Sequence, residues 1–332
     1  MSSTIAPSTV KVPKTDAEWK EALQALPDTP DRIPSFFFGH GSPVLQFPET
    51  SSRSDPMSEY CGPKGPLARF LADFGPTLLR KYKPKGILVF SAHWETAGER
   101  LGAHTFYSSH LSSFTDYGND QPLLMDYFGF DKEMYELKFS SDGSHDLSLR
   151  VVEAFRAAGH PARTTSVKEA RGRDGRGSYR PGLDHGVFIP FRIMFGHDFH
   201  DVPIVQASID SSLSPEKNWQ IGKAVASLRE EGILILSGGL TIHTFSDFRA
   251  FAESTAGPGF KKFDQAILDA ASKPTPLLKD ALVDLTKHEG FRKAHPREEH
   301  FVPLYIAAGA GEGGDAKILS GNYGSPTFAF GL

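Results

Sequence analysis

A short, continuous apolar run that ends beside a histidine is the feature that most constrains the fold. Residues 86–95 read GILVFSAHWE, so that four large apolar side chains are followed by two small residues and then by His93. A run of this length and composition is typical of a strand that is buried on both faces. In open α/β sheets, ligands bind just beyond the carboxyl ends of such strands, and that is where we expect His93.

The same arrangement occurs twice more in the chain. The apolar run 34–38 leads into His40, and the apolar run 233–236 leads into His243, both through segments that contain glycine. Because glycine permits tight turns and a close approach of the backbone to a ligand, these strand exits suit a binding site. Three strands that each present a histidine at one edge of a parallel sheet predict a functional site at that edge.

The segments between these runs predict an α/β fold, with a central, mostly parallel sheet flanked by helices in a single domain. Helical spacing of apolar side chains or capping signals occur at residues 16–26, 67–79, 144–158, 214–228, 260–271 and 275–287. Gly75-Pro76 is expected to kink or interrupt the second of these. Residues 101–107 and 327–330 are expected to be strands, and 47–66 and 108–121 loops. We expect residues 1–30 to be an N-terminal extension with one short helix, and 31–332 to be the catalytic domain.

Composition excludes several classes of protein. The net charge of -4 gives no basic field for nucleic acid, and no uninterrupted apolar segment is long enough to span a bilayer. The first twenty residues lack the apolar stretch of a secretory signal, so we expect a cytoplasmic protein. Cys61 is the only cysteine, which excludes disulfides within the chain and thiolate metal clusters.

The histidines have two interpretations when they are judged by their surroundings. Neutral imidazole is the commonest protein ligand for metals such as zinc and ferrous iron. The spacings between these histidines are long, however, and match no local zinc motif. Each histidine taken alone is more often a packed or hydrogen-bonded residue. Their joint placement at strand exits makes a metal site an equal alternative, so both interpretations stay open at this point.

Six segments of the chain resemble a known family. The strings FFFGHGSP, VFSAHWE, GLDHGVFIPFRIMF, PIVQASIDSS, GILILSGGLTIHTFSDF and EEHFVPLYIAAGA are similar, in the same order, to those of the class III extradiol ring-cleavage dioxygenases. Within this LigB-like superfamily, the DOPA 4,5-dioxygenase type is the most similar branch. The resemblance extends from about Pro34 to the C-terminus, and six blocks in one order are far more specific than any single motif.

The resemblance implies one mononuclear metal site. His40, His93 and His300 would be the metal ligands, with His300 in the place where another branch of the superfamily has a glutamate. Ferrous iron, Fe(2+), is the metal expected for activity, and zinc, Zn(2+), suits three histidines as well. Glu299, directly before His300, keeps a carboxylate ligand open as an alternative.

The resemblance also implies two active-site histidines that do not bind the metal. His243 corresponds to the acid/base histidine of the family, and His185 to a second active-site histidine. Asp184 is a candidate to hold His185 in one tautomer. Trp94 and Tyr127 are candidates to wall the substrate ring, and the glycine-rich basic segment 168–180 is either a surface loop or a lid.

The function implied is an extradiol dioxygenase that cleaves a catechol with O2 to a muconic semialdehyde, acting on DOPA or a related phenolic. Its partners would be a small-molecule catechol and O2, without nucleic acid or membrane. Two alternatives stay open. Three histidines with one open position would equally suit a zinc-dependent hydrolase. The same fold also occurs in proteins without catalytic activity, although retention of His185 and His243 argues against that role here.

Overall fold

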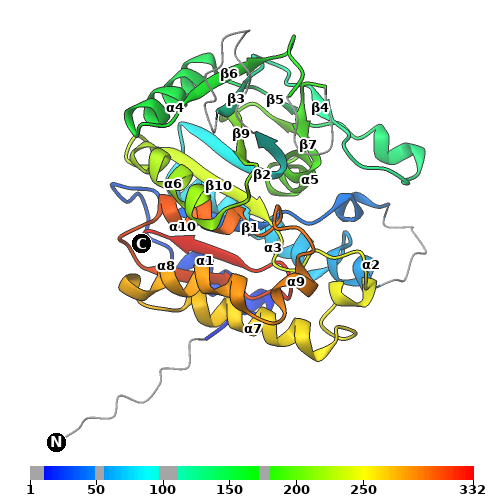
Figure 1. Ribbon diagram of the computed structural model, residues 1–332. Coiled ribbons are helices and arrows are strands. Elements are labelled where there is room, and N and C mark those ends of the chain that lie inside the picture. Colours follow the sequence, from blue (N-terminus) through cyan, green and yellow to red (C-terminus); the bar gives the residue numbers. More distant parts are fainter. Residues whose placement is uncertain (1–10, 49–55, 97–110, 172–179) are drawn as a thin grey trace, which may run out of the picture.

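The fold is organised around a twisted sheet of eight strands in the computed structural model, which describes residues 11–48, 56–96, 111–171 and 180–332 (Figure 1). The strands, in chain order, are β1 (Ser35–Gly39), β2 (Gly86–Thr96), β3 (Ser112–Asp116), β6 (Ala162–Ser166), β9 (Ile204–Asp210), β10 (Ile233–Gly239), β11 (Ala316–Ser320) and β12 (Thr327–Phe330). Two further ribbons pair β4 (Leu123–Leu124) with β7 (Leu183–Asp184), and β5 (Ser140–Ser141) with β8 (Asp198–Phe199).

The centre of the main sheet is parallel. The strand order is β11-β12-β1-β10-β2-β9-β3-β6, and the four central strands β1, β10, β2 and β9 all run in the same direction. Antiparallel pairs join β12 to β1, β11 to β12 and β3 to β9. The carboxyl ends of β1, β10 and β2, the three strands predicted to present histidines, are therefore neighbours at one edge.

Alternating side chains of the central strands enter separate cores. In β1, Phe36 and Phe38 pack into the core beneath one group of helices, whereas Phe37 packs into the core on the opposite face. Ile87 and Val89 of β2 likewise face away from Leu88 and Phe90. Both faces are buried, which explains why these strands read as continuous apolar runs rather than as alternating patterns.

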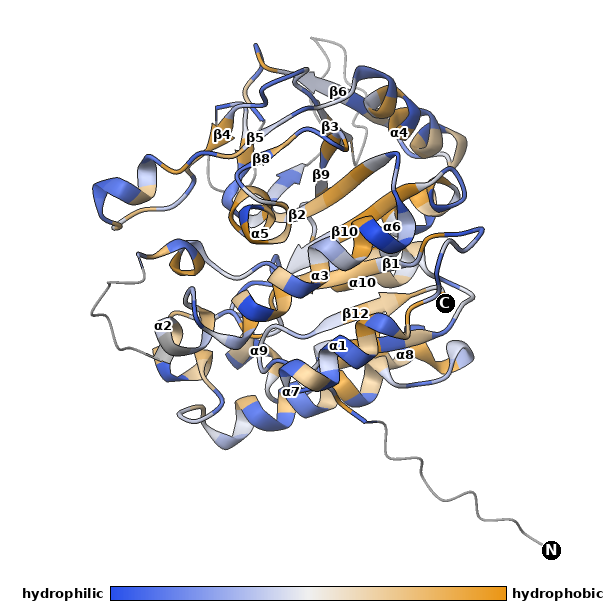
Figure 2. Cartoon of the chain, turned by 180° about the vertical axis from the view of Figure 1, so that it is seen from behind, coloured by the Kyte–Doolittle hydropathy of each residue, from blue (hydrophilic) through white to orange (hydrophobic). Residues whose placement is uncertain are grey.

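Helices cover both faces of the sheet, as Figures 1 and 2 show. They are α1 (Asp16–Gln24), α2 (Pro56–Cys61), α3 (Pro66–Tyr82), α4 (His145–Ala157), α5 (His185–Phe195), α6 (Pro215–Val225), α7 (Pro258–Ala271), α8 (Thr275–Asp284), α9 (Phe291–Ala294) and α10 (Pro303–Ala310). Buried residues of α1, α3 and α5 share one core with the sheet, while those of α4, α6 and α10 lie on the other face. None of the described helices combines the length and the apolar character needed to cross a membrane.

The short helix expected near the N-terminus is α1. Its N-cap Thr15 and Glu18 form a capping box, which satisfies backbone N–H groups at the helix start. Trp19 is fully buried in the core that contains Phe36, and its indole Nε1 donates to Asp73 of α3 at 2.9 Å. The helix therefore packs on the sheet domain, and the division at residue 30 stays a prediction.

Two expected loops contain regular structure, and the helix that Gly75-Pro76 was expected to kink or interrupt is not interrupted. The helix α3 continues through Pro76, where it packs against α5 so closely that a Cβ on Gly75 would lie 2.4 Å from the Met194 carbonyl oxygen. The segment expected to be a loop before it contains α2. The strand β3 lies in a polar segment also expected to be a loop, because side chains such as Thr115, whose hydroxyl accepts from Gln206 N, supply part of its bonding. Residues 101–107 lie outside the described residues.

The helices α6 and α10 pack tightly against each other in the core that they share with α4. A Cβ on Gly222 would lie 2.1 Å from the Ile306 carbonyl oxygen, and one on Gly309 would lie 2.3 Å from the Trp219 carbonyl oxygen. Since α10 begins only three residues after His300, this contact helps to set the position of that histidine.

We expect Gly222→Ala to destabilise the fold by about 1–3 kcal/mol, because the added methyl group must displace backbone atoms of α10. Gly259→Ala in α7 is the matched control, since nothing lies within 4 Å of its Cβ position. That change should be neutral or stabilise by ~0.4–1 kcal/mol. Urea unfolding followed by circular dichroism measures both, and equal midpoints for the two variants would contradict the packing argument.

Candidate active site

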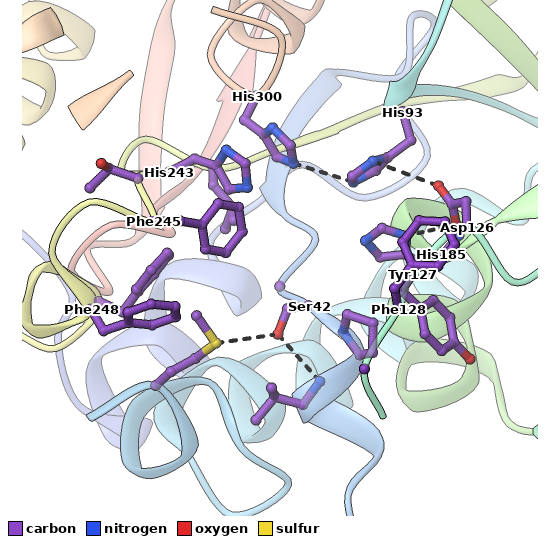
Figure 3. A pocket seen from close by; sticks show the side chains of 18 of the residues that line it. Ser42, His93, Asp126, Tyr127, Phe128, His185, His243, Phe245, Phe248 and His300 are labelled. Atoms are coloured by element: carbon purple, nitrogen blue, oxygen red, sulfur yellow. Dashed lines mark hydrogen bonds and ion pairs between the residues drawn. The ribbon is translucent and has the colours of Figure 1, made fainter. Parts of the chain in front are cut away.

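Three buried histidines lie together at the carboxyl edge of the central strands. His40 directly follows β1, His93 lies in the last part of β2, and His300 precedes α10. One ring nitrogen from each lies within 4.8 Å of the others. The Nε2 atoms of His93 and His300 are 3.2 Å apart, and a dashed line joins the two rings in Figure 3. The structure thus brings together the three histidines that the sequence suggested as ligands.

His93 was expected beyond the end of its strand, but it lies within β2. The pairing of β2 with β10 ends at Ser91, and a register shift in its pairing with β9 falls between Phe90 and Glu95. Such irregularities redirect side chains and are frequent beside active sites. Here the irregular part of the strand contains His93.

His40 has an unusual environment for a buried imidazole. Both ring nitrogens are buried and have no hydrogen-bond partner among the described residues. Burial, and after it the charge of His185, lowers the pKa of His40 to about 3, so the ring is neutral at physiological pH. An orphaned neutral imidazole is costly unless a ligand uses its lone pair. The donor set of His40, His93 and His300 therefore fits a transition metal.

Asp126 orients His185. The His185 ring Nδ1 lies 2.7 Å from Asp126 Oδ1, and the His185 backbone N–H donates to the same oxygen at 3.0 Å. The second carboxylate oxygen lies 3.7 Å from His93 Nδ1. Although burial opposes ionisation, the charge and hydrogen bonds of His185 hold the pKa of Asp126 below its usual value. The carboxylate therefore stays charged and fixes the ring of His185.

The expectation that Asp184 would hold His185 was wrong. The Asp184 carboxylate accepts from the Ser91 hydroxyl at 2.7 Å, forms an ion pair with Arg171 at 2.8 Å, and accepts from Gln206. Ser91 in turn accepts from the His93 backbone N–H at 3.1 Å. Asp184 thus supports the irregular part of β2, and the neighbour in sequence is not the neighbour of the ring.

His243 lies on the opposite side of the metal-ligand candidates from His185. Its ring stacks on that of His300, with centroids 3.5 Å apart and planes at 18°. Glu299 serves both rings, because its Oε1 lies 3.2 Å from His300 Nδ1 and 3.8 Å from His243 Nδ1. Burial, followed by the charge of His300, holds the pKa of His243 well below its usual value. His243 is therefore neutral at physiological pH.

Arg297 closes this side of the site. Its guanidinium forms a bidentate ion pair with Glu95 of β2 and lies 3.3 Å from Glu299 Oε2. Because Glu95 is buried, this pair joins the end of β2 to the loop that contains His300. Glu299 therefore lies between Arg297 and the rings of His243 and His300.

The loop that contains His243 is supported from below by Asp264 of α7. The carboxylate accepts from Gly324 N at 2.9 Å, and Gly324 O accepts from Thr241 N at 3.0 Å. The His243 backbone N–H donates to the Ala294 carbonyl at 2.9 Å. Burial raises the pKa of Asp264 to about 7.

His93, His185, His243 and His300 line a pocket of about 740 Å³. Besides the histidines, the residues that line it include Ser42, Pro43, Val44, Phe47, Met57, Asp126, Tyr127, Phe128, Phe130, Phe245, Phe248, Phe251, Arg297 and Glu299. Tyr127 lines the pocket as expected. Trp94 does not line it, because its ring packs on Arg171 and its Nε1 donates to the Arg171 carbonyl at 2.8 Å. Arg171 is thus buried, and residues 172–179 of the basic segment lie outside the described residues.

Sequence reasoning missed several residues of this site. No motif connects Asp126 to His185, which follows it by 59 positions in the sequence. The sequence offered a clearer signal for Phe245 and Phe248. Both follow His243 in a polar stretch, where an aromatic side chain is exposed and is not needed for a core.

Comparison with known proteins matches nearly the whole chain to one family. The family described as the catalytic LigB subunit of aromatic ring-opening dioxygenase matches residues 35–330. A protein of Schizosaccharomyces pombe named 4,5-DOPA dioxygenase extradiol-like protein is 40% identical over 317 residues, which cover 95% of this chain and 97% of that protein. Proteins named 4,5-DOPA dioxygenase extradiol are 27% identical in Beta vulgaris, over 90% of this chain and 94% of that protein, and 29% identical in Escherichia coli, over 85% and 86%.

A crystal structure of an uncharacterized protein from Escherichia coli K12 has the same fold. The structural match covers 90% of this chain and 100% of that chain, with a TM-score of 0.59 and 23% sequence identity.

The raised pKa of Asp264 predicts a pH dependence of stability. Because the folded state holds this proton more tightly than the unfolded state, stability should fall as pH rises from the ordinary range of an aspartate to about 7. Asp264→Asn keeps an acceptor for Gly324 N and removes the charge, so it should be more stable than the wild type by ~2–4 kcal/mol at pH 8 and similar to it near pH 4. Urea unfolding at the two pH values measures this difference. Parallel pH profiles of stability for the two proteins would contradict it.

Proposed function

Since this chain belongs to the family of the catalytic LigB subunit of aromatic ring-opening dioxygenases, we propose that it is a metal-dependent extradiol dioxygenase that cleaves a catechol to a muconic semialdehyde. Both atoms of O2 enter the product, and one ring carbon–carbon bond breaks. The observation that carries the proposal is the orphaned, neutral imidazole of His40 beside His93 and His300 at the end of an apolar pocket. The names of the relatives favour DOPA or a related phenolic as the substrate.

We assign His40, His93 and His300 as the metal ligands. Two other groups of side chains also bring three ligand atoms together, His93 with Asp126 and His185, and Glu299 with His243 and His300. In these groups the carboxylate is already engaged, Asp126 by His185 and Glu299 by Arg297. Ferrous iron would supply open coordination positions and a redox-active centre through which a catecholate can reduce O2, and zinc can occupy the same nitrogens.

His243 and His185 perform the proton transfers in this proposal. His243 is neutral at physiological pH, so an imidazole nitrogen can accept a catechol hydroxyl proton and return it to an oxygen later in the reaction. At His185 the exchange is assigned to Nε2, because Nδ1 is engaged by Asp126 at 2.7 Å.

Oxygen uptake tests the reaction. Apo-protein loaded anaerobically with ferrous iron should, on addition of air and a catechol, consume one O2 per catechol and form a yellow product. DOPA and unsubstituted catechol are the first substrates, and zinc-loaded protein is the control that should consume no oxygen. No uptake with any catechol, despite bound iron, would return the choice to the zinc hydrolase or the non-catalytic protein.

Substitutions test the roles of the histidines. His40→Ala, His93→Ala and His300→Ala should each lose stoichiometric metal, whereas His243→Ala should keep metal and lose turnover by ~10²–10⁴-fold. His197→Ala, at an exposed histidine outside the pocket, is the matched control and should keep both. Metal content and circular dichroism are measured on every variant. Full metal occupancy in the folded His93 variant would refute the ligand assignment.

A further inference from the structure

Aromatic side chains form two opposite sides of the pocket beyond the histidines. Figure 3 shows Phe245 and Phe248 on one side and Tyr127 and Phe128 on the other, with His93 and His300 at one end between them. The two sides come from separate loops, one after β10 and the other after β4. A ligand that reaches the histidines must therefore lie between two aromatic walls.

The phenylalanines at the mouth are strongly exposed. The exposed fraction is 80% for Phe128, 60% for Phe245 and 57% for Phe248. The rings of Phe245 and Phe248 also contact the active site. Phe245 packs edge-on against His243 with ring centroids 4.9 Å apart, and its centroid lies 5.9 Å from that of Phe248. Large apolar side chains gathered at the mouth of a pocket mark a surface that a ligand covers.

The charged groups of the pocket are already paired with one another. Arg297 is the only lysine or arginine among the described residues that line the pocket, and it binds Glu95 and Glu299. Of the two carboxylates, Asp126 is held by His185 and Glu299 by Arg297. A substrate with a free carboxylate, such as an amino acid, would meet a described lining with two acidic groups and one engaged base. A carboxylate in the pocket is repelled by these two acidic side chains, and no uncommitted cation of the described lining offsets that repulsion.

We propose that the catechol bound here carries an uncharged apolar substituent, alkyl or aryl, which lies between Phe245 and Phe248 on one side and Tyr127 and Phe128 on the other. The inference rests on the proposed function, because it places the two catechol hydroxyls at the histidines. The substituent then extends toward the exposed phenylalanines. The chain therefore prefers such catechols to DOPA, which the names of its relatives mention.

A matched pair of ligands tests the preference. Propylcatechol keeps the three-carbon chain of DOPA and lacks its ammonium and carboxylate groups. Calorimetry with zinc-loaded protein under anaerobic conditions measures binding without turnover, and propylcatechol should bind at least about tenfold more tightly than DOPA. Dopamine and dihydrocaffeate, which carry only the ammonium or only the carboxylate, show which charge is excluded. DOPA binding as tightly as propylcatechol would overturn the inference.

Substitutions locate the substituent. Phe248→Ala should lower the ratio of the propylcatechol and DOPA affinities by about three- to tenfold, because one aromatic contact is lost. Leu277→Ala is the matched control, since Leu277 is 56% exposed on α8 and does not line the pocket. Phe248→Arg should shift the preference toward dihydrocaffeate by adding a cation. An unchanged ratio in both Phe248 variants would overturn the assigned location.

Turnover separates the two possible failures. If ferrous-loaded protein consumes oxygen with DOPA faster than with propylcatechol, the proposed function stands and the inference on the substituent fails. If it consumes oxygen with neither, nor with unsubstituted catechol, the proposed function itself fails, and with it the inference.

Discussion

The carboxyl end of β10 positions most of the active-site histidines. The Gly239 carbonyl accepts from His40 N at 3.1 Å, and Leu240 N donates to the His300 carbonyl at 2.9 Å. A Cβ on Gly239 would lie 2.4 Å from that same His300 oxygen, so only glycine permits the contact. His243 follows Gly239 by four residues. The backbone of one strand end thus holds three of the five active-site histidines, and the parallel pairing of β10 with β2 brings in the strand that contains His93.

Neutrality is the second constraint, because five imidazoles in one small volume repel one another when protonated. Burial keeps His40 and His243 neutral. Two carboxylates lie beside the five histidines. Asp126 contacts Nδ1 of His185, and Glu299 contacts Nδ1 of His300. They orient rings without joining the group formed by His40, His93 and His300. Because Asp126 and Glu299 are both paired, the described lining of the pocket contains no uncommitted charge. The pairing that suits a metal site thus also affects which substrates can bind.

How much of the fold could be predicted from the sequence depended on how far apart in the chain the interacting residues lie. Caps and periodicity are local, so the helix that begins after Ser144 and the one that begins after Ser214 were predicted correctly. The continuation of α3 through Pro76 was not, because its support comes from α5 far along the chain. The polar strand β3 was missed for the same reason, since side-chain hydroxyls of β3 and of the distant strand β9 supply part of the bonding between the two. Within the site, the apolar runs before His40, His93 and His243 predicted those histidines, and the family resemblance added His185 and His300, whereas neither signal pointed to Asp126.

The sequence by itself determined the parallel centre of the sheet and the histidines at its carboxyl edge, because the apolar runs, the glycines after them and the family resemblance are all properties of short segments. Only the tertiary structure decided which acid orients which histidine. Asp184 adjoins His185 in sequence but binds Ser91 and Arg171, while Asp126, 59 positions away, reaches the ring. Only the tertiary structure placed Phe128 opposite Phe245 and Phe248. Such pairings depend on where separate loops meet in space, and no local pattern of residues encodes that meeting.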